Sequence, residues 1–268
     1  MKLNREKLYK KISMKNYFKL IRKISNRNNK LYNLQTESFS QVIFCRISYL
    51  ITPFFIFLKI SPNIITFLNF IISILSLILI FLGNEIFFNY GIFLYFLYRT
   101  IDFCDGGVAR YKNISTFYGR FIDAVADIFF NSFILFSLSF FAYEYFDSKF
   151  LLVTGVIASI LTSFDSFIYD KYSSLARWSN FQNKNKILPY IKKTFLPKIS
   201  FMYNDIITIA ILMLPFLIHN NEIFYFAILL VFVVFILSAI QTFLVHLYFG
   251  FINLNLNAAD KNSSKKAK

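Results

Sequence analysis

The sequence predicts an all-α polytopic membrane protein with about six transmembrane helices and an N-terminal amphipathic helix in the membrane interface. Three observations predict this class. The 268 residues are 57% hydrophobic and 21% aromatic, with only 7 glycines, a composition that excludes a soluble globular domain. Apolar stretches of about the 20 residues needed to cross a bilayer recur along the chain. Basic residues gather in a few of the segments that separate these stretches.

The chain begins with a basic extension, residues 1–38, in which apolar positions recur at a weak helical spacing. We expect this extension to lie on the cytoplasmic leaflet as an amphipathic segment, with a disordered extension as the alternative. Residues 39–58 are apolar but carry Arg46 and Pro53, and basic residues flank them on both sides. We therefore expect a helix in the plane of the interface rather than one that crosses the membrane.

Six spans follow this interfacial helix. Pro62 marks the start of the first, and Asn63 or Thr66 can cap its N-terminus. The second span runs directly into a cluster of charged residues. The fifth is short, with Asp205 near its start and Pro215 near its end. The expected spans are residues 64–82, 86–104, 119–142, 150–170, 204–219 and 223–248.

The 29 Lys and Arg residues divide unequally between the two sides of the predicted bundle. Only Lys149 falls in the three loops expected on the outer side. The positive-inside rule then places both termini on the cytoplasmic side of a bacterial-type inner membrane. Attraction to anionic lipid head groups accounts for the net charge of +15, and the distribution of the basic residues argues against nucleic acid as a partner. We expect one membrane domain, residues 39–250, followed by a polar basic tail, residues 251–268.

Four aspartates lie at the cytoplasmic side of this predicted bundle, between stretches of almost pure hydrocarbon. Asp102 and Asp105 lie three residues apart, and Asp123 and Asp127 lie four apart, so each pair shares one helix face. Charged side chains near membrane depth are costly and mark functional sites. Two facing pairs of carboxylates suit hard divalent cations, which prefer oxygen ligands. The spacing therefore predicts a metal site formed by two helices.

Small residues and an arginine complete this pattern, which reads Asp-x2-Asp-Gly-x2-Ala-Arg-x8-Gly-x3-Asp-x3-Asp over residues 102–127. The pattern resembles the signature of the CDP-alcohol phosphotransferases, which include the phosphatidyltransferases of phospholipid synthesis, and every fixed position is present. Residues 61–66 also resemble the Pro-Asn-x-x-Thr turn that opens the first span in this family. The hydrophobic pattern agrees more loosely over residues 40–250.

The resemblance implies a membrane enzyme that transfers a phosphatidyl-type group from a CDP-linked lipid to the hydroxyl of a polar alcohol and releases CMP. It implies two Mg²⁺ or Mn²⁺ ions as cofactors, held by Asp102, Asp105, Asp123 and Asp127. It also implies that Asp127 is the general base and that the protein is a homodimer. The residues that would bind the nucleotide and its phosphates are Asn63, Gly106, Ala109, Arg110 and Gly119.

The acceptor alcohol is less defined by the sequence. A long basic loop, residues 171–203, faces the same predicted side as the aspartates and favours an acceptor that carries a phosphate group. We expect Arg120, Asp170 and Arg177 to contact the acceptor. A solvated loop and a solvated helix end, without any such contacts, are the alternative.

Other functions share parts of this pattern. A small CDP-activated alcohol that delivers its phosphoalcohol to a lipid or glycan acceptor would use the same motif. Intramembrane prenyltransferases also bind Mg²⁺ through aspartates, but their motifs lack the Gly-x2-Ala-Arg portion. A cation transporter would place carboxylates near the membrane midplane in repeated halves, and the sequence shows no second copy of the motif.

Overall fold

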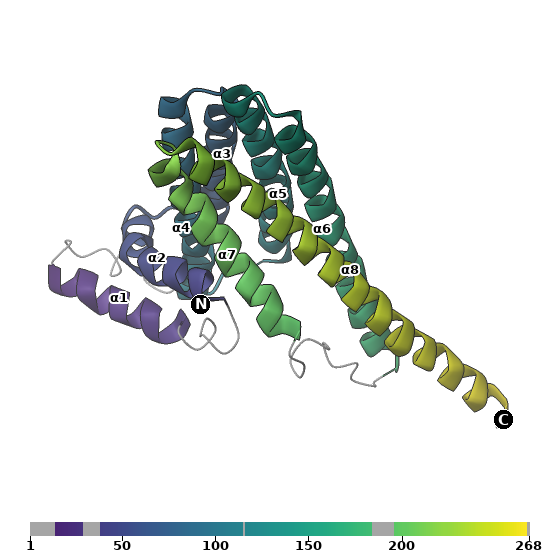
Figure 1. Ribbon diagram of the computed structural model, residues 1–268. Coiled ribbons are helices and arrows are strands. Elements are labelled where there is room, and N and C mark those ends of the chain that lie inside the picture. The colour runs from purple at the N-terminus through teal and green to yellow at the C-terminus, as the bar shows by residue number, and fades with distance from the viewer. Residues whose placement is uncertain (1–13, 29–37, 115, 184–195, 267–268) are drawn as a thin grey trace. The chain divides into compact units, whose positions relative to one another are not determined.

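The computed structural model describes residues 14–28, 38–114, 116–183 and 196–266, and within these ranges it consists of eight helices without a strand (Figure 1). This confirms the predicted all-α class. The chain divides into two compact units, Met1–Phe130 and Asn131–Lys268, and the division falls within α5. The helices are α1 (Met14–Asn28), α2 (Phe39–Phe57), α3 (Pro62–Phe81), α4 (Glu85–Lys112), α5 (Phe117–Phe146), α6 (Lys149–Asn183), α7 (Leu196–Leu217) and α8 (Asn221–Lys266).

Five helices in the described part of the chain are long and apolar enough to cross a membrane, as expected for a polytopic protein. They are α2, α3, the greater part of α5, the first part of α6, and α8 as far as Tyr248. Four of them match expected spans. The expected second span lies in α4, where Asn89, Arg99 and Asp102 dilute the apolar sequence, and the expected fifth span retains an apolar stretch of only Asp205–Leu217. The fifth qualifying helix is α2, whose placement in the interface plane stays a prediction from its charged flanks.

Serine side chains begin the two helices that precede the predicted metal site. At α2, the Gln41 N–H donates to Ser38 Oγ over 3.4 Å, and the Ser38 N–H donates to Gln41 Oε1 over 3.3 Å, which is a capping box. At α3, the Ile64 N–H donates to Ser61 Oγ over 3.4 Å. The prediction that Asn63 or Thr66 caps α3 is therefore wrong, because proline favours the first helical position and the cap stands just before it.

A short connection turns the chain from α4 into α5. Asn113 ends α4 in the left-handed conformation, with φ 55°, which lets the chain reverse after the last helical turn. Thr116 then caps α5, because the Gly119 N–H donates to Thr116 Oγ1 over 3.0 Å. Lys112, at the end of α4, donates from Nζ to the Ile60 carbonyl over 2.7 Å, and burial lowers the pKa of its amine. The Asn113 conformation and the Thr116 cap set where α4 ends and α5 begins, and the Lys112 contact ties the end of α4 to the segment between α2 and α3.

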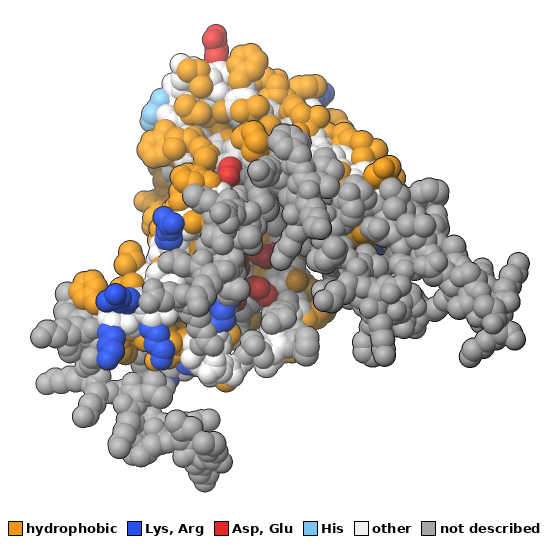
Figure 2. All heavy atoms as spheres, turned by 90° about the horizontal axis from the view of Figure 1, so that it is seen from below, with side chains coloured by type: hydrophobic (Ala, Val, Ile, Leu, Met, Phe, Trp, Pro, Cys, Tyr) orange, Lys and Arg blue, Asp and Glu red, His pale blue; other side chains and the backbone are white. Residues whose placement is uncertain are grey.

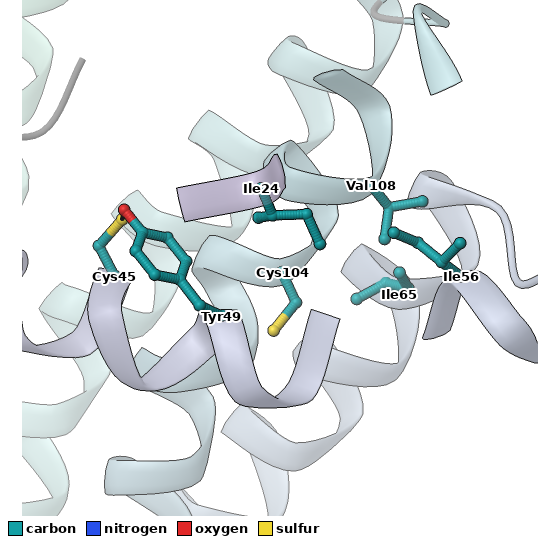
Figure 3. Packing of buried hydrophobic residues seen from close by; sticks show 7 residues of the cluster. All are labelled: Ile24, Cys45, Tyr49, Ile56, Ile65, Cys104 and Val108. Carbon is teal, nitrogen blue, oxygen red and sulfur yellow. Dashed lines mark hydrogen bonds between the residues drawn. The ribbon is translucent and has the colours of Figure 1, made fainter. Parts of the chain in front are cut away.

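The first unit has a core built from α1, α2, α3 and α4. The Tyr17 hydroxyl donates to the Leu50 carbonyl and holds α1 against α2. On α3, Ser76 Oγ donates to the Gly91 carbonyl of α4 over 2.8 Å, and a Cβ at Gly91 would lie 2.6 Å from Ile80 Cγ1. Glycine at this position therefore permits the close approach of α3 and α4. The cluster of buried side chains shown in Figure 3 is Ile24, Cys45, Tyr49, Ile56, Ile65, Cys104 and Val108.

The second unit packs the C-terminal part of α5 with α6, α7 and α8. Ser159 Oγ on α6 donates to the Ser132 carbonyl on α5 over 2.8 Å. A Cβ at Gly155 would lie 2.4 Å from Ser139 Cβ and 2.7 Å from the Phe232 ring, so α6 needs a glycine where it approaches α5 and α8. The predicted metal site lies wholly in the first unit.

Candidate active site

Three of the four motif aspartates converge from α4 and α5. One carboxylate oxygen each from Asp102, Asp123 and Asp127 lies within 4.8 Å of the others, and all three side chains are half-buried. Asp102 comes from α4, and the other two lie one turn apart on α5. Three carboxylates at this separation repel one another unless a cation lies between them. Their oxygens are the ligands that Mg²⁺ and Mn²⁺ prefer, so these residues fit such an ion.

Asp105 lies beside this group but is held separately. Its side chain is buried, and the Thr66 hydroxyl of α3 donates to Asp105 Oδ2 over 2.5 Å. The Gly106 N–H donates to the other oxygen, Oδ1. Both carboxylate oxygens therefore accept hydrogen bonds, which fixes the direction of the side chain. A role for Asp105 as a ligand to a second ion stays a prediction.

Asp127 receives a hydrogen bond from a tyrosine on the facing helix. The Tyr98 hydroxyl donates to Asp127 Oδ1 over 2.7 Å, and the Tyr98 ring is fully buried. The ring packs against Phe130, with ring centroids 4.0 Å apart, and Phe130 in turn stacks on Tyr95 at 5.8 Å. The bond from Tyr98 goes to Oδ1, so Oδ2 of Asp127 receives no hydrogen bond from this tyrosine.

A cavity of about 340 Å³ opens beside the carboxylates, a size within the range of small-ligand sites. Asp102, Asp105 and Asp123 line it. Its other lining residues include all five that were expected to bind the nucleotide, namely Asn63, Gly106, Ala109, Arg110 and Gly119. In the view from below, acidic side chains lie in a hollow near the centre of this face, and Lys and Arg side chains gather on the side of α1 (Figure 2).

Two glycines of the motif keep the walls of the cavity open. A Cβ at Gly106 would lie 3.0 Å from Arg110 Nη1 and 3.3 Å from Nη2, so the guanidinium lies directly against the backbone of α4. A Cβ at Gly119 would lie 3.2 Å from Thr116 Oγ1 and 3.4 Å from Asn63 Oδ1. The absence of side chains at these positions leaves the space in which Arg110 and Asn63 face the cavity.

The three predicted acceptor residues belong to α5 and α6. Arg120, Asp170 and Arg177 are in helices, but their side chains lie outside the part of the chain that the structure describes. The long basic loop expected over residues 171–203 is wrong in its bounds, because α6 continues to Asn183 and α7 begins at Leu196; residues 184–195 lie outside the described part of the chain. The acceptor site therefore stays a prediction from the sequence.

Three residues that neighbour the motif aspartates were not identified from the sequence as part of the site. Thr66 was interpreted as part of a helix start, and Tyr98 was not singled out. Arg99 was counted only among the cytoplasmic basic residues. A signal was present for Arg99, because it lies three residues before Asp102 on the same helix face, inside an expected span. The pairing of Thr66 with Asp105 depends instead on the packing of α3 against α4, which spacing along one helix does not reveal.

The comparisons with known proteins agree with this geometry. Comparison with curated proteins finds no match to the chain. A sequence model described as CDP-alcohol phosphatidyltransferase matches residues 59–245, a range that contains the three aspartates, the cavity and the beginning of α3. Because this match covers more than two-thirds of the chain, the protein belongs to the CDP-alcohol phosphatidyltransferase family.

Proposed function

We propose that the protein transfers a phosphatidyl-type group from a CDP-linked lipid to the hydroxyl of a polar alcohol, releases CMP, and serves phospholipid biosynthesis. Family membership supports the coarser statement, transfer of a phosphoalcohol from a CDP-alcohol. The observation that carries the proposal is the cavity beside Asp102 and Asp123, because it combines carboxylates, an arginine and small residues in a space suited to a nucleoside diphosphate.

The donor's phosphates would be bound by Arg110. Its guanidinium lies against Gly106 and faces the cavity, and a guanidinium fork binds phosphate oxygens through paired charge-assisted hydrogen bonds. Asn63 and Ala109 line the same cavity, where small or amide side chains allow the nucleotide to approach α4. This assigns binding and orientation of the donor to the side of the cavity formed by α3 and α4.

The carboxylates would hold Mg²⁺ or Mn²⁺, which when bound polarises the phosphoryl group and stabilises the leaving CMP. Asp102, Asp123 and Asp127 supply the nearest group of oxygen ligands, and Asp105 lies beside them. Their fixed positions on two helices orient the donor's pyrophosphate within the cavity. Orientation of this kind accounts for a large part of catalysis in phosphoryl transfer.

Asp127 would act as the general base. The Tyr98 hydroxyl holds Oδ1, so Oδ2 is the oxygen that takes the proton of the acceptor hydroxyl. The acceptor oxygen forms a bond to the phosphorus that carries the donor's alcohol, and the bond from that phosphorus to the bridging oxygen breaks. The electron pair leaves with CMP. Tyr98 is a positioning residue in this scheme, because it acts through Asp127.

A lipid donor is favoured over a small CDP-alcohol by the surface next to the cavity. Ile64 and Phe67 on α3 are more than half exposed, and they lie among the residues that supply one wall of the cavity, Pro62, Asn63 and Thr66. Such apolar side chains on a membrane helix suit acyl chains. The alternative, a small CDP-alcohol that delivers its phosphoalcohol to a lipid or glycan, would use the same carboxylates.

The proposal also includes the acceptor, the membrane topology and the oligomeric state. The basic residues support cytoplasmic termini, a cytoplasmic active site and a phosphorylated acceptor near Arg120, Asp170 and Arg177. Family resemblance supports a homodimer.

Release of CMP by the purified protein in lipid-containing micelles tests the proposal. CDP-diacylglycerol would be supplied with Mg²⁺ or Mn²⁺ and one alcohol at a time, phosphorylated and not, with Asp127→Asn as the control. We expect acceptor-dependent release that the variant lacks. Binding of CDP without release from any lipid donor would favour the small CDP-alcohol instead. Absence of CDP binding would refute both.

A further inference from the structure

Asp105 belongs to the motif but stands apart from the other three aspartates. In the part of the chain that the structure describes, Asp102, Asp123 and Asp127 form the set whose oxygens lie within 4.8 Å of one another, and Asp105 is not in it. We call this set the aspartate group. Asp105 is only 8% exposed, yet it lines the same cavity as Asp102 and Asp123. A buried carboxylate outside the group needs a partner of its own.

That partner is Thr66, which lines the cavity from α3. The Thr66 hydroxyl donates to Asp105 Oδ2 over 2.5 Å, a short hydrogen bond of the kind that carboxylates form. The Gly106 N–H donates to Oδ1 of the same carboxylate. These two bonds hold Asp105 toward α3 and toward its own backbone. Asp105 must therefore turn before one of its oxygens can join the aspartate group.

Thr66 has a second acceptor within reach. Its Oγ1 also lies 3.2 Å from the Pro62 carbonyl, one turn earlier on α3. A hydroxyl carries a single proton, so Thr66 donates fully to only one of these two oxygens at a time. If Asp105 turns away, the hydroxyl can donate to Pro62 and is not left unpaired. The second acceptor thus lowers the free energy needed to move the carboxylate.

We propose that Thr66 is a two-position hydroxyl switch for Asp105. It holds the carboxylate outside the aspartate group, and it turns to Pro62 when a divalent cation competes for that carboxylate. The inference rests on the metal site of the proposed function and adds a positioning residue to it, because Thr66 acts through Asp105.

Repulsion between carboxylates gives this switch a purpose. Four carboxylates gathered without a cation repel one another more strongly than three, and the repulsion disfavours their charged forms. Thr66 keeps the fourth carboxylate on a hydrogen bond until a cation is present. Because the hydroxyl and the cation compete for Asp105, Thr66 also weakens the binding of the cation.

Binding of Mn²⁺ to the full-length protein in lipid-containing micelles tests the inference, with the free ion followed by electron paramagnetic resonance in the absence of nucleotide. Thr66→Val removes the hydroxyl at nearly constant volume, and Thr66→Ser keeps it. We expect Thr66→Val to bind Mn²⁺ about tenfold more tightly than the wild type, because the cation no longer competes with a hydrogen bond to a charged group. Thr66→Ser should bind Mn²⁺ like the wild type.

Asp105→Asn supplies the matched background for a double-mutant cycle. If the hydroxyl acts through the Asp105 carboxylate, Thr66→Val should change the affinity for Mn²⁺ little once Asp105→Asn is present. A thermal melt of each variant without Mn²⁺ checks that it folds. If valine prevents folding, Thr66→Ala, which also lacks the hydroxyl, replaces it with the same expectation.

Each other outcome overturns the inference. Unchanged or weaker Mn²⁺ binding without the hydroxyl would leave Thr66 as an ordinary helix side chain. An equal effect of Thr66→Val with and without Asp105→Asn would show that it does not act through this carboxylate. If neither hydroxyl-free variant folds, Thr66 serves the fold rather than the metal site. If the wild type binds no Mn²⁺, the proposed metal site itself fails; if Asp105→Asn binds Mn²⁺ as well as the wild type does, only the inference fails.

Discussion

Gly106→Ala tests whether Arg110 binds the donor's phosphates from its position against Gly106. The new Cβ would lie 3.0 Å from Arg110 Nη1 and 3.3 Å from Nη2, closer than carbon and nitrogen atoms normally approach. The guanidinium is the far end of a long, flexible side chain, so we expect the side chain to move rather than the helix to be strained. A hydrogen bond to a charged group contributes about 1.5–3 kcal/mol. Loss of this contact should raise the KM for the CDP-linked donor by about 10- to 150-fold.

Stability should not fall in this variant. Alanine is favoured over glycine in a helix interior by about 1 kcal/mol, and the clash is relieved by movement of a side chain. Gly107→Ala is the matched control. Its Cβ would lie 3.1 Å from Thr52 Cγ2 on α2, and Thr52 is fully buried with its hydroxyl bonded to the Ser48 carbonyl over 2.7 Å. Overpacking of this kind costs about 1–3 kcal/mol, so this control should lower the melting temperature and leave the donor KM unchanged.

The assay is release of CMP at varied donor concentration, together with a thermal melt of each variant in the same micelles. We expect different results at the two adjacent glycines: a higher KM for the donor in Gly106→Ala and a lower melting temperature in Gly107→Ala. An unchanged donor KM in Gly106→Ala would show that Arg110 does not bind the donor's phosphates from this position. If both variants change the donor KM and the melting temperature equally, the contact of Gly106 with Arg110 does not differ in effect from the contact of Gly107 with Thr52, and the prediction is refuted.

Three further predictions test other parts of the site and the fold. Tyr98→Phe keeps the ring against Phe130 but removes the hydrogen-bond donor to Asp127, the proposed general base, so kcat should fall about tenfold while the donor KM stays constant in the CMP assay. Treatment with a chelator should abolish CMP release, and Mg²⁺ or Mn²⁺ should restore it; activity that persists in chelator would refute the metal site. Ile24→Asp buries a charge in the core of the first unit and should lower the melting temperature strongly, whereas Phe18→Asp, at a position 61% exposed on the same helix, should not.

The prediction of the site from the sequence depended on spacing within single helices. Asp102 and Asp105 share a face of α4, and Asp123 and Asp127 share a face of α5, because three and four residues make about one helical turn. Because α5 begins at Phe117, only a few residues after α4 ends at Lys112, these two faces lie close together. The pattern therefore predicted that Asp102, Asp123 and Asp127 gather, whereas Asp105 lies beside them on hydrogen bonds of its own.

Spacing within one helix did not predict the residues that orient these carboxylates, because each of them bonds to a carboxylate on a different helix. Thr66 lies 39 residues before Asp105, and Tyr98 lies 29 residues before Asp127. Their hydrogen bonds exist only because α3 packs against α4 and α4 lies beside α5. Helix packing depends on close contacts such as Gly91 against Ile80, which are a property of three-dimensional shape rather than of residue spacing.

The sequence also predicts incompletely which helices cross the membrane. Hydropathy and length identify α3 and α8 without difficulty, because no charged residue interrupts their apolar sequences. They do not identify α4, since the residues that give α4 its chemistry also lower its hydropathy. The charged residues of the motif thus make α4 harder to recognise as a span from composition than α3 or α8. Arg99 illustrates this, because a count of basic residues assigns it to the cytoplasmic side, whereas it lies one helical turn before Asp102 within an expected span. The depth of a charged residue along its helix, measured from the carboxylates, therefore has to be considered together with its charge when membrane topology is predicted from a sequence.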